Sequence, residues 1–291
     1  MWRIGLKETG RYAAGLLGAL LLAAIVSAMG AKAGLPAAAL ARVLALARFD
    51  FGTSAMTAMP AAAEMARRLP ATLELVGGGA VVAILIGGPL GLLLSWGRAL
   101  RAAAPLIQFV AAAPVFCAGL ALLWLAHRFH WDVSAQKGLL FWPALLHGDA
   151  AGIAAALPAF ALPALVVGAA GAASVELAIR RSAREAGEES YRKGLRLMGL
   201  GAFEVDRLYM APRVLAGLLA NLGEITLSLF SAAAVAEWVF DWPGAAILFI
   251  RSVALQDWNV AALVLFAFAA IALTAAFIGA LAASALGGAE P

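Results

Sequence analysis

Charge is scarce in this chain: only 13% of its 291 residues are Asp, Glu, Lys or Arg, whereas 64% are hydrophobic. A soluble domain of this size needs a charged, solvated exterior and cannot conceal so much apolar surface. The mean hydropathy of +0.93 agrees. The net charge of +4 does not indicate nucleic-acid binding, because the basic residues lie where the inner loops of a membrane protein are expected. The composition therefore predicts an integral membrane protein.

Residues that bind metals or form disulfides are also scarce. Cys117 is the single cysteine, which excludes an intrachain disulfide and a cysteine-based metal site. His127 and His130 have helical spacing, but no carboxylate stands at a matching position to complete a metal site. We predict neither a metal nor another cofactor.

Catalytic and nucleotide-binding motifs are missing. The sequence has no nucleophile elbow, no HExxH and no GxxxxGK[ST] loop for phosphates. The chain is therefore not predicted to be an enzyme, and any ATP that drives it has to bind to another subunit.

Long apolar runs are abundant. Six of them are long enough to cross about 30 Å of hydrocarbon as helices at 1.5 Å per residue. They cover 12–30, 73–96, 105–126, 157–179, 214–235 and 259–286. The predicted fold is all-α with about six transmembrane helices.

The basic residues predict the orientation of these spans. With the N-terminus inside, the inner segments carry 13 of the 21 Lys and Arg residues, and eight of those lie between Arg180 and Arg213. Lys and Arg concentrate in short cytoplasmic loops. Both termini are therefore predicted to be cytoplasmic.

The spans divide the chain into three parts. Residues 1–30 form an N-terminal transmembrane helix, and 31–72 form a periplasmic loop with interfacial helices at 35–48 and 61–68. Residues 73–291 form the main transmembrane domain with a cytoplasmic loop at 180–213. Within the second span, Gly87 and Gly91 are spaced for close helix packing.

One polar stripe stands out in the fifth span. Asn221, Glu224, Ser228 and Ser231 are spaced 3, 4 and 3, which places them on one helical face. A carboxylate in a span usually faces the bundle interior, a partner or water. The stripe fits two interpretations equally: it lines a transport path, or it forms a buried interhelical hydrogen-bonding face.

Two other carboxylates have simpler explanations. Glu74 lies at the outer edge of its span, where it can reach headgroups or water. Glu176 has Arg180 one turn later, which predicts an ion pair. In the second outer loop, Phe141 and Trp142 suit the membrane–water interface.

The cytoplasmic loop contains more than topogenic charge. Apolar side chains at 191, 195, 197, 198 and 200 alternate with its basic residues. A short helix with such residues needs a partner to cover them. We expect this helix to end near Gly199, because glycine readily adopts the left-handed conformation that closes helices.

Several short motifs support a family resemblance from about Phe49 onward. They are FGTS at 51–54, RLPATLEL at 68–75, IGGPLG at 86–91, LP at 157–158 and 162–163, ESY at 189–191 with GL at 199–200, and VFDWPG at 239–244. In their order and spacing the chain resembles the permease subunits of ABC importers, in particular the B-type subunit of the dipeptide, oligopeptide and nickel group.

This resemblance implies a type I importer permease in a bacterial inner membrane. The expected partners are a second, C-type permease, two cytoplasmic ATPase subunits, a periplasmic solute-binding protein and membrane lipid, with no nucleic acid. The inner loop then holds a coupling helix that inserts into the ATPase. The predicted coupling positions are Glu189, Tyr191, Lys193, Leu195, Arg196, Met198, Gly199 and Leu200.

A second set of positions is predicted at the periplasmic mouth, as a short re-entrant or interfacial turn near the docking site of the binding protein. These positions are Trp238, Asp241, Trp242, Pro243 and Gly244. The transported solute stays open among peptides, nickel, glycosides and similar small solutes.

Two other classes of protein remain as alternatives. A secondary transporter would use Glu224 for proton coupling and would usually show two related halves. A membrane-embedded enzyme or assembly factor would need a convergent polar site, for which only the stripe from Asn221 to Ser231 is available.

Overall fold

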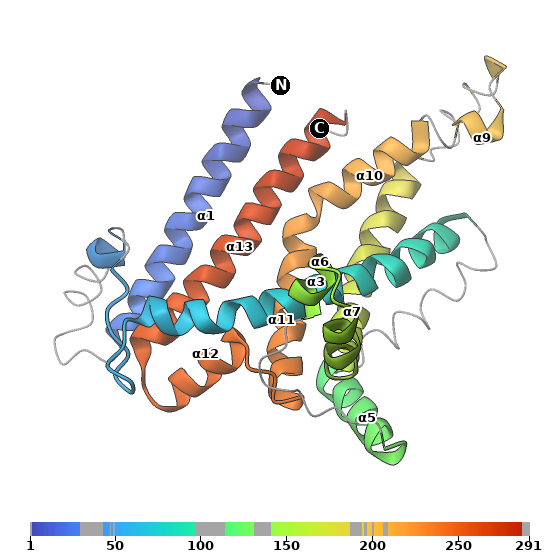
Figure 1. Ribbon diagram of the computed structural model, residues 1–291. Helices are drawn as coiled ribbons and strands as arrows, with labels where there is room; N and C mark the ends of the chain where they lie inside the picture. The colour runs from blue at the N-terminus through green and yellow to red at the C-terminus, as the bar shows by residue number, and fades with distance from the viewer. Residues whose placement is uncertain are drawn as a thin grey trace.

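The computed structural model describes residues 2–29, 43–46, 48, 50–96, 114–130, 141–186, 194, 197–199, 201–205 and 209–286. The secondary structure of these residues is helical (Figure 1). Their only β pairing is an isolated bridge between Thr53 and Pro60. The predicted all-α class is confirmed.

Five helices are long and apolar enough to cross a membrane. They are α1 (Trp2–Ala28), α3 (Ala61–Trp96), α7 (Ala150–Ala186), α11 (Leu222–Val239) and α13 (Trp258–Ala285). The predicted third span, 105–126, lies partly outside the described residues, and its end falls in the shorter helix α5 (Val115–Arg128).

The predicted fifth span is not one continuous helix. Helix α10 (Ala211–Ala220) ends at Asn221, and α11 begins after it. Asn221 has a non-helical conformation, with a φ of −97° and a ψ of 9°. The Asn221 amide donates a hydrogen bond of 2.7 Å to the carbonyl of Gly217. Asn side chains compete with the helix for backbone partners in this way, and the competition favours a break.

The first outer segment also differs from the prediction. Residues 61–68 are not a separate interfacial helix but the first turns of α3, which continues through Pro70. Membrane helices tolerate proline because neighbouring groups satisfy the freed backbone carbonyl. The predicted boundary at 72–73 thus falls inside a helix. Of the other expected helix, only 43–46 and 48 are described, and 43–46 are helical.

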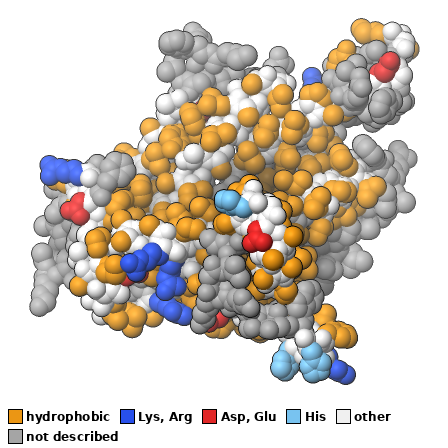
Figure 2. All heavy atoms as spheres, in the orientation of Figure 1, with side chains coloured by type: hydrophobic (Ala, Val, Ile, Leu, Met, Phe, Trp, Pro, Cys, Tyr) orange, Lys and Arg blue, Asp and Glu red, His pale blue; other side chains and the backbone are white. Residues whose placement is uncertain are grey.

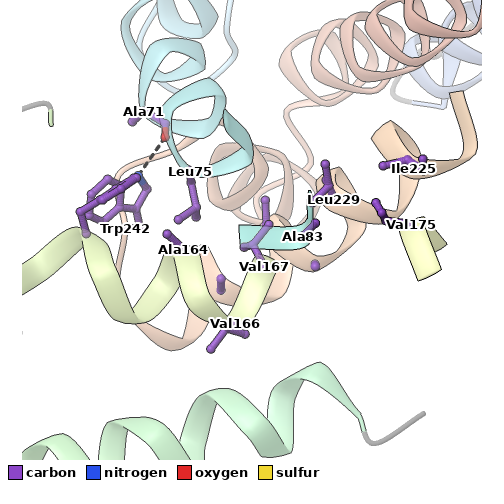
Figure 3. Close-up of a cluster of buried hydrophobic side chains, with 14 of the residues drawn as sticks. Ala71, Leu75, Ala83, Ala164, Val166, Val167, Val175, Ile225, Leu229 and Trp242 are labelled. Atoms are coloured by element: carbon purple, nitrogen blue, oxygen red, sulfur yellow. Dashed lines mark hydrogen bonds between the residues drawn. The ribbon is translucent and has the colours of Figure 1, made fainter. Parts of the chain in front are cut away.

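The main core lies where α3, α7 and α11 pack together. Leu75, Val167, Val175 and Leu229 are nearly fully buried in it (Figure 3). The predicted close packing of α3 is confirmed, because a Cβ on Gly91 would lie 2.9 Å from the carbonyl oxygen of Glu176.

Helices α1 and α13 lie side by side. The Tyr12 hydroxyl is 3.1 Å from Oγ1 of Thr274, and the Tyr12 ring stacks on Phe277. The N- and C-terminal ends lie at the same end of the molecule, on the side of the short helix α9 (Ala202–Val205) (Figure 1). Helix α12 (Ala245–Ala254), which connects α11 to α13, lies at the opposite end.

The surface is strongly apolar. Among the described side chains on the visible face, hydrophobic ones predominate, and charged groups form a few small clusters (Figure 2). The outward side of α3 carries Ile84 and Leu85, which are 55% and 67% exposed. Apolar exposure on this scale suits contact with lipid rather than water.

Candidate functional site

Of the predicted coupling segment, the structure describes only residues 194 and 197–199. Glu189, Tyr191, Lys193, Leu195, Arg196 and Leu200 lie outside the described residues. Met198 is 80% exposed, and the neighbouring Leu197 is 89% exposed. Gly199 has a φ of +90°, the left-handed conformation expected of a glycine that closes a helical turn.

The helices that enter and leave the inner loop touch closely. Ser182 lies in the last turns of α7 and donates a hydrogen bond of 3.0 Å to the carbonyl of Ala178. Gly217 of α10 packs against it so tightly that an added Cβ would overlap the Ser182 hydroxyl. The contact fixes the position of one flank of the loop relative to the other.

The polar stripe divides at the helix break. Asn221 forms the break itself, whereas Glu224 and Ser231 are exposed on α11 and Ser228 is half-buried. The Ser231 hydroxyl donates a hydrogen bond to the carbonyl of Leu227. The Glu224 carboxylate has no hydrogen bond or ion pair to any described residue.

The opposite side of α11 explains why Glu224 points outward. Ile225, Leu229, Ala233 and Ala236 are buried in the core with α3 and α7. The exposed face of α11 therefore carries Glu224 together with Leu227, Ser231 and Trp238. Because a carboxylate facing hydrocarbon is costly, this face calls for water or a protein partner.

The predicted mouth segment is a tight turn between α11 and α12. The backbone N–H of Trp242 donates to the carbonyl of Glu237 at 2.9 Å, and that of Gly244 donates to Trp242 at 2.8 Å. Asp241 has a φ of 49° at the corner. Its carboxylate is 3.7 Å from the Arg251 guanidinium, and both side chains are mostly exposed.

The two tryptophans of the turn have different surroundings. Trp238 is 55% exposed and lies beside Phe116 of α5, as an interfacial residue does. Trp242 is only 5% exposed. Its indole N–H donates a 3.0 Å hydrogen bond to the carbonyl of Ala71 in α3 (Figure 3). Trp242 thus belongs to the core.

Glu237 is a central residue that the sequence analysis did not single out. It is completely buried. It accepts a hydrogen bond of 2.5 Å from the Thr72 hydroxyl and one of 2.8 Å from the backbone N–H of Ile247. Helical periodicity separates it from the Glu224 face, because it follows Leu229 and Ala233 at steps of four.

Glu74 does not reach headgroups or water, so that prediction is wrong. Its side chain is buried, and its carboxylate accepts hydrogen bonds from the backbone N–H groups of Phe141 and Trp142. These two residues begin the short helix α6 (Phe141–Leu146). The first N–H groups of a helix have no partner within it, and a carboxylate is well suited to bind them.

The aromatic residues of α6 likewise pack inward rather than lie freely at the interface. The Phe141 ring stacks on Phe160 of α7, with 4.6 Å between centroids. The Trp142 indole donates a hydrogen bond to the carbonyl of Glu74 and lies against Gly77. Helix α6 is therefore fastened to α3 and α7.

The remaining buried carboxylate is paired as predicted. Glu176 lies 2.7 Å from the Arg180 guanidinium within α7, which confirms the expected ion pair. Among the described residues no group of three His, Cys, Asp or Glu side chains could hold a metal ion.

Taken together, the five long apolar helices and their exposed hydrophobic side chains are typical of a multi-pass membrane protein. The chain belongs to the family of binding-protein-dependent transport system inner membrane components, whose model matches residues 79–287. It is accordingly a multi-pass protein of the bacterial inner membrane and a transport component rather than an enzyme. The matched residues include α7, α10, α11, α12 and α13.

Three curated relatives are similar over most of the chain. The probable D,D-dipeptide transport system permease protein DdpB of Escherichia coli K12 is 30% identical over 226 residues, which cover 72% of this chain and 66% of that protein. The putrescine export system permease protein SapB of the same strain is 27% identical over 233 residues, which cover 73% of this chain and 72% of that protein. The peptide transport system permease protein SapB of Salmonella typhimurium LT2 is 26% identical with the same coverage.

Proposed function

We propose that the chain is one of two permease subunits of an ATP-driven importer and forms half of its translocation pathway. One observation carries this proposal: α11 buries its apolar side and exposes Glu224 and Ser231. A second permease facing this side would enclose the polar groups in an aqueous path. The chain itself then performs no bond chemistry.

Peptides are the proposed solutes. The names of DdpB and of the Salmonella SapB refer to dipeptides and peptides, whereas the name of SapB from Escherichia coli K12 refers to putrescine. Peptides and putrescine have in common a cationic amino group. Glu224 is suited to such a group by charge, and the hydroxyls of Ser228 and Ser231 supply neutral hydrogen-bonding groups.

The inner loop is the proposed contact with two ATPase subunits. Leu197 and Met198 are highly exposed at the end of a helical turn that Gly199 closes. Their exposure supports a docking role, because apolar side chains on a polar surface are typical of protein contacts. Glu189, Tyr191 and Leu195 would belong to the same coupling helix.

The proposed orientation places the inner loop and both termini in the cytoplasm. The described ends of α1 and α13 lie at the same end of the molecule as α9, and the turn between α11 and α12 lies at the other end (Figure 1). This turn would then face the periplasm, where a solute-binding protein docks. Asp241 of this turn and Arg251 of α12 are exposed charged groups on this side.

In the proposed mechanism, closure of the ATPases upon ATP binding moves the coupling helix. The movement reaches α10 through the end of the loop, and α10 joins α11 at the break at Asn221. A displacement of α10 can thereby reorient the face that carries Glu224. Access to the path alternates between the two sides of the membrane.

Affinity purification of the tagged chain from its native membrane tests this proposal. We expect an ATPase subunit and a second permease to co-purify in stoichiometric amounts. Purification of the chain without them, together with uptake that follows a proton gradient and needs no ATP, would instead favour a secondary transporter that uses Glu224.

A further inference from the structure

The carboxylate of Glu237 joins three helices at one buried point. Glu237 lies near the end of α11, Thr72 lies in α3, and Ile247 lies in the first turn of α12. One carboxylate oxygen accepts from the Thr72 hydroxyl and the other from the Ile247 backbone N–H. The Thr72 oxygen in turn accepts a 2.7 Å hydrogen bond from the backbone N–H of Ala245.

The space around this carboxylate is fitted to it. Gly244 precedes α12, and a Cβ at this position would overlap both carboxylate oxygens of Glu237. Its φ of −90° and ψ of −179° are accessible to any residue, so the need for glycine at this position is one of space. The turn can therefore close against α11 only because residue 244 has no side chain.

The same point is reinforced from α3. The indole N–H of Trp242 in the turn donates a hydrogen bond to the carbonyl of Ala71, the residue directly before Thr72. Two adjacent residues of α3 thus bind the turn and α12 from one side. The exposed groups next to this buried point are Trp238, Asp241 and Arg251.

We propose that Glu237 is the positioning residue of the outer mouth: its carboxylate holds α3, α11 and α12 in one fixed arrangement, and this arrangement sets the surface on which the solute-binding protein docks. The inference rests on the proposed function, since it assigns a role to the mouth of that importer. Glu237 itself touches neither the solute nor the binding protein.

The chemistry of the site distinguishes informative variants. Glu237→Ala removes both acceptors, and Thr72→Val removes the hydroxyl that donates to Glu237 and accepts from Ala245. Thr72→Ser keeps that hydroxyl and serves as the conservative control. Gly244→Ala introduces a methyl group, and the three atoms nearest to that methyl group all belong to the Glu237 carboxylate.

The first test measures the arrangement directly in the purified complex in nanodiscs. Spin labels are placed on cysteines at Leu73 and Leu255, two exposed positions, the first within α3 and the second directly after α12, with Cys117 replaced by serine. We expect a narrow distance distribution in the wild type and in Thr72→Ser, and a broad one in Glu237→Ala and Thr72→Val. Equal widths in all four would overturn the inference.

The second test measures docking as the stimulation of ATP hydrolysis by increasing amounts of solute-loaded binding protein. In Glu237→Ala, the half-maximal concentration should rise about tenfold, because docking must then also order the loosened mouth surface. The rate at saturation should stay near that of the wild type. A purely structural defect would lower the yield and the saturated rate together, and an unchanged half-maximal concentration would refute the docking role.

Gly244→Ala supplies an internal check. Alone, it should raise the half-maximal concentration as Glu237→Ala does, but in the double variant the methyl group fills vacated space. The two effects should therefore be strongly non-additive. Additive effects would contradict the contact between Gly244 and Glu237. A wild-type complex whose ATP hydrolysis does not respond to the binding protein would instead contradict the proposed function. In that case the spin-label distances alone would test whether Glu237 holds the three helices together.

Discussion

Gly217 of α10 lies directly against Ser182 of α7, with no room for a side chain between them. An added Cβ on Gly217 would lie 2.5 Å from the Cβ of Ser182 and overlap its hydroxyl. These residues flank the inner loop. Their contact therefore controls how the loop is held against the transmembrane helices.

Gly217→Ala should consequently destabilise the complex by about 1–3 kcal/mol, the usual cost of overpacking. Gly88→Ala is the matched control, because a Cβ there meets no other atom within 4 Å. Thermal unfolding of the detergent-solubilised complex measures both.

The exchange Gly217→Ala with Ser182→Gly should restore most of the lost stability. Ser182→Gly removes the obstructing atoms and leaves the Cα at 3.7 Å from the new methyl group. A glycine inside a helix costs about 1 kcal/mol, but the exchange removes one glycine from α10 as it adds one to α7, so this cost largely cancels. If the complex with the exchange were no more stable than the complex with Gly217→Ala alone, the contact with Ser182 would not be the cause of the lost stability.

Glu74→Ala should release α6 from α3. The backbone N–H groups of Phe141 and Trp142 would lose their acceptor, at a cost of about 1–3 kcal/mol. We expect faster proteolysis next to α6 in the variant, measured on the purified complex. Glu185→Ala, at an exposed glutamate near the end of α7, should show the wild-type rate. Equal rates for all three proteins would argue against the fastening.

The transmembrane helices were predictable because each needs only an apolar run of sufficient length. The spans that contain Leu75, Val167 and Val264 lie within long helices of the structure. The ion pair between Glu176 and Arg180 was predictable as well, since both residues lie within one turn of α7.

Contacts between distant segments were not predictable. Thr72 and Glu237 are separated by 165 positions, and nothing in either local pattern links them. Glu74 was assigned to the interface because the sequence does not reveal that α6 folds back against it. The break at Asn221 depends on a side-chain hydrogen bond that hydropathy does not detect.

Topology is tested by reporters fused after Pro291 and inserted at Gly148, in the turn before α7. The proposed orientation places the first in the cytoplasm and the second in the periplasm. A phosphatase that is active only outside and a fluorescent protein that is active only inside report the two sides. Finding both positions on one side would refute the orientation.

The exposed face of α11 is tested by cysteine labelling in a Cys117→Ser background. Ser231→Cys should react with a hydrophilic thiol reagent in at least one nucleotide state, because its side chain faces the proposed path. Leu229→Cys is the control, since Leu229 is only 3% exposed in the core. Absence of labelling at position 231 in every state would leave a packing role for the stripe.

Glu224→Gln removes the charge of the stripe and keeps its size. We expect the complex to assemble normally, because Glu224 is exposed and forms no hydrogen bond or ion pair with the described residues. Uptake of a cationic peptide should decrease relative to that of the same peptide with its amino terminus acetylated. Loss of assembly before any change in uptake would show that Glu224 forms a helix contact.

The central claim is that the inner loop couples this chain to ATPase subunits, and transport-coupled ATP hydrolysis by the purified, reconstituted complex tests it most directly. Leu195→Asp places a charge on the predicted docking face, where burial without a partner costs several kcal/mol. The variant should insert and fold but lose the stimulation of ATP hydrolysis. Arg192→Gln, on the opposite face, should retain it. Full stimulation in Leu195→Asp would contradict the account and leave the segment as a topogenic loop.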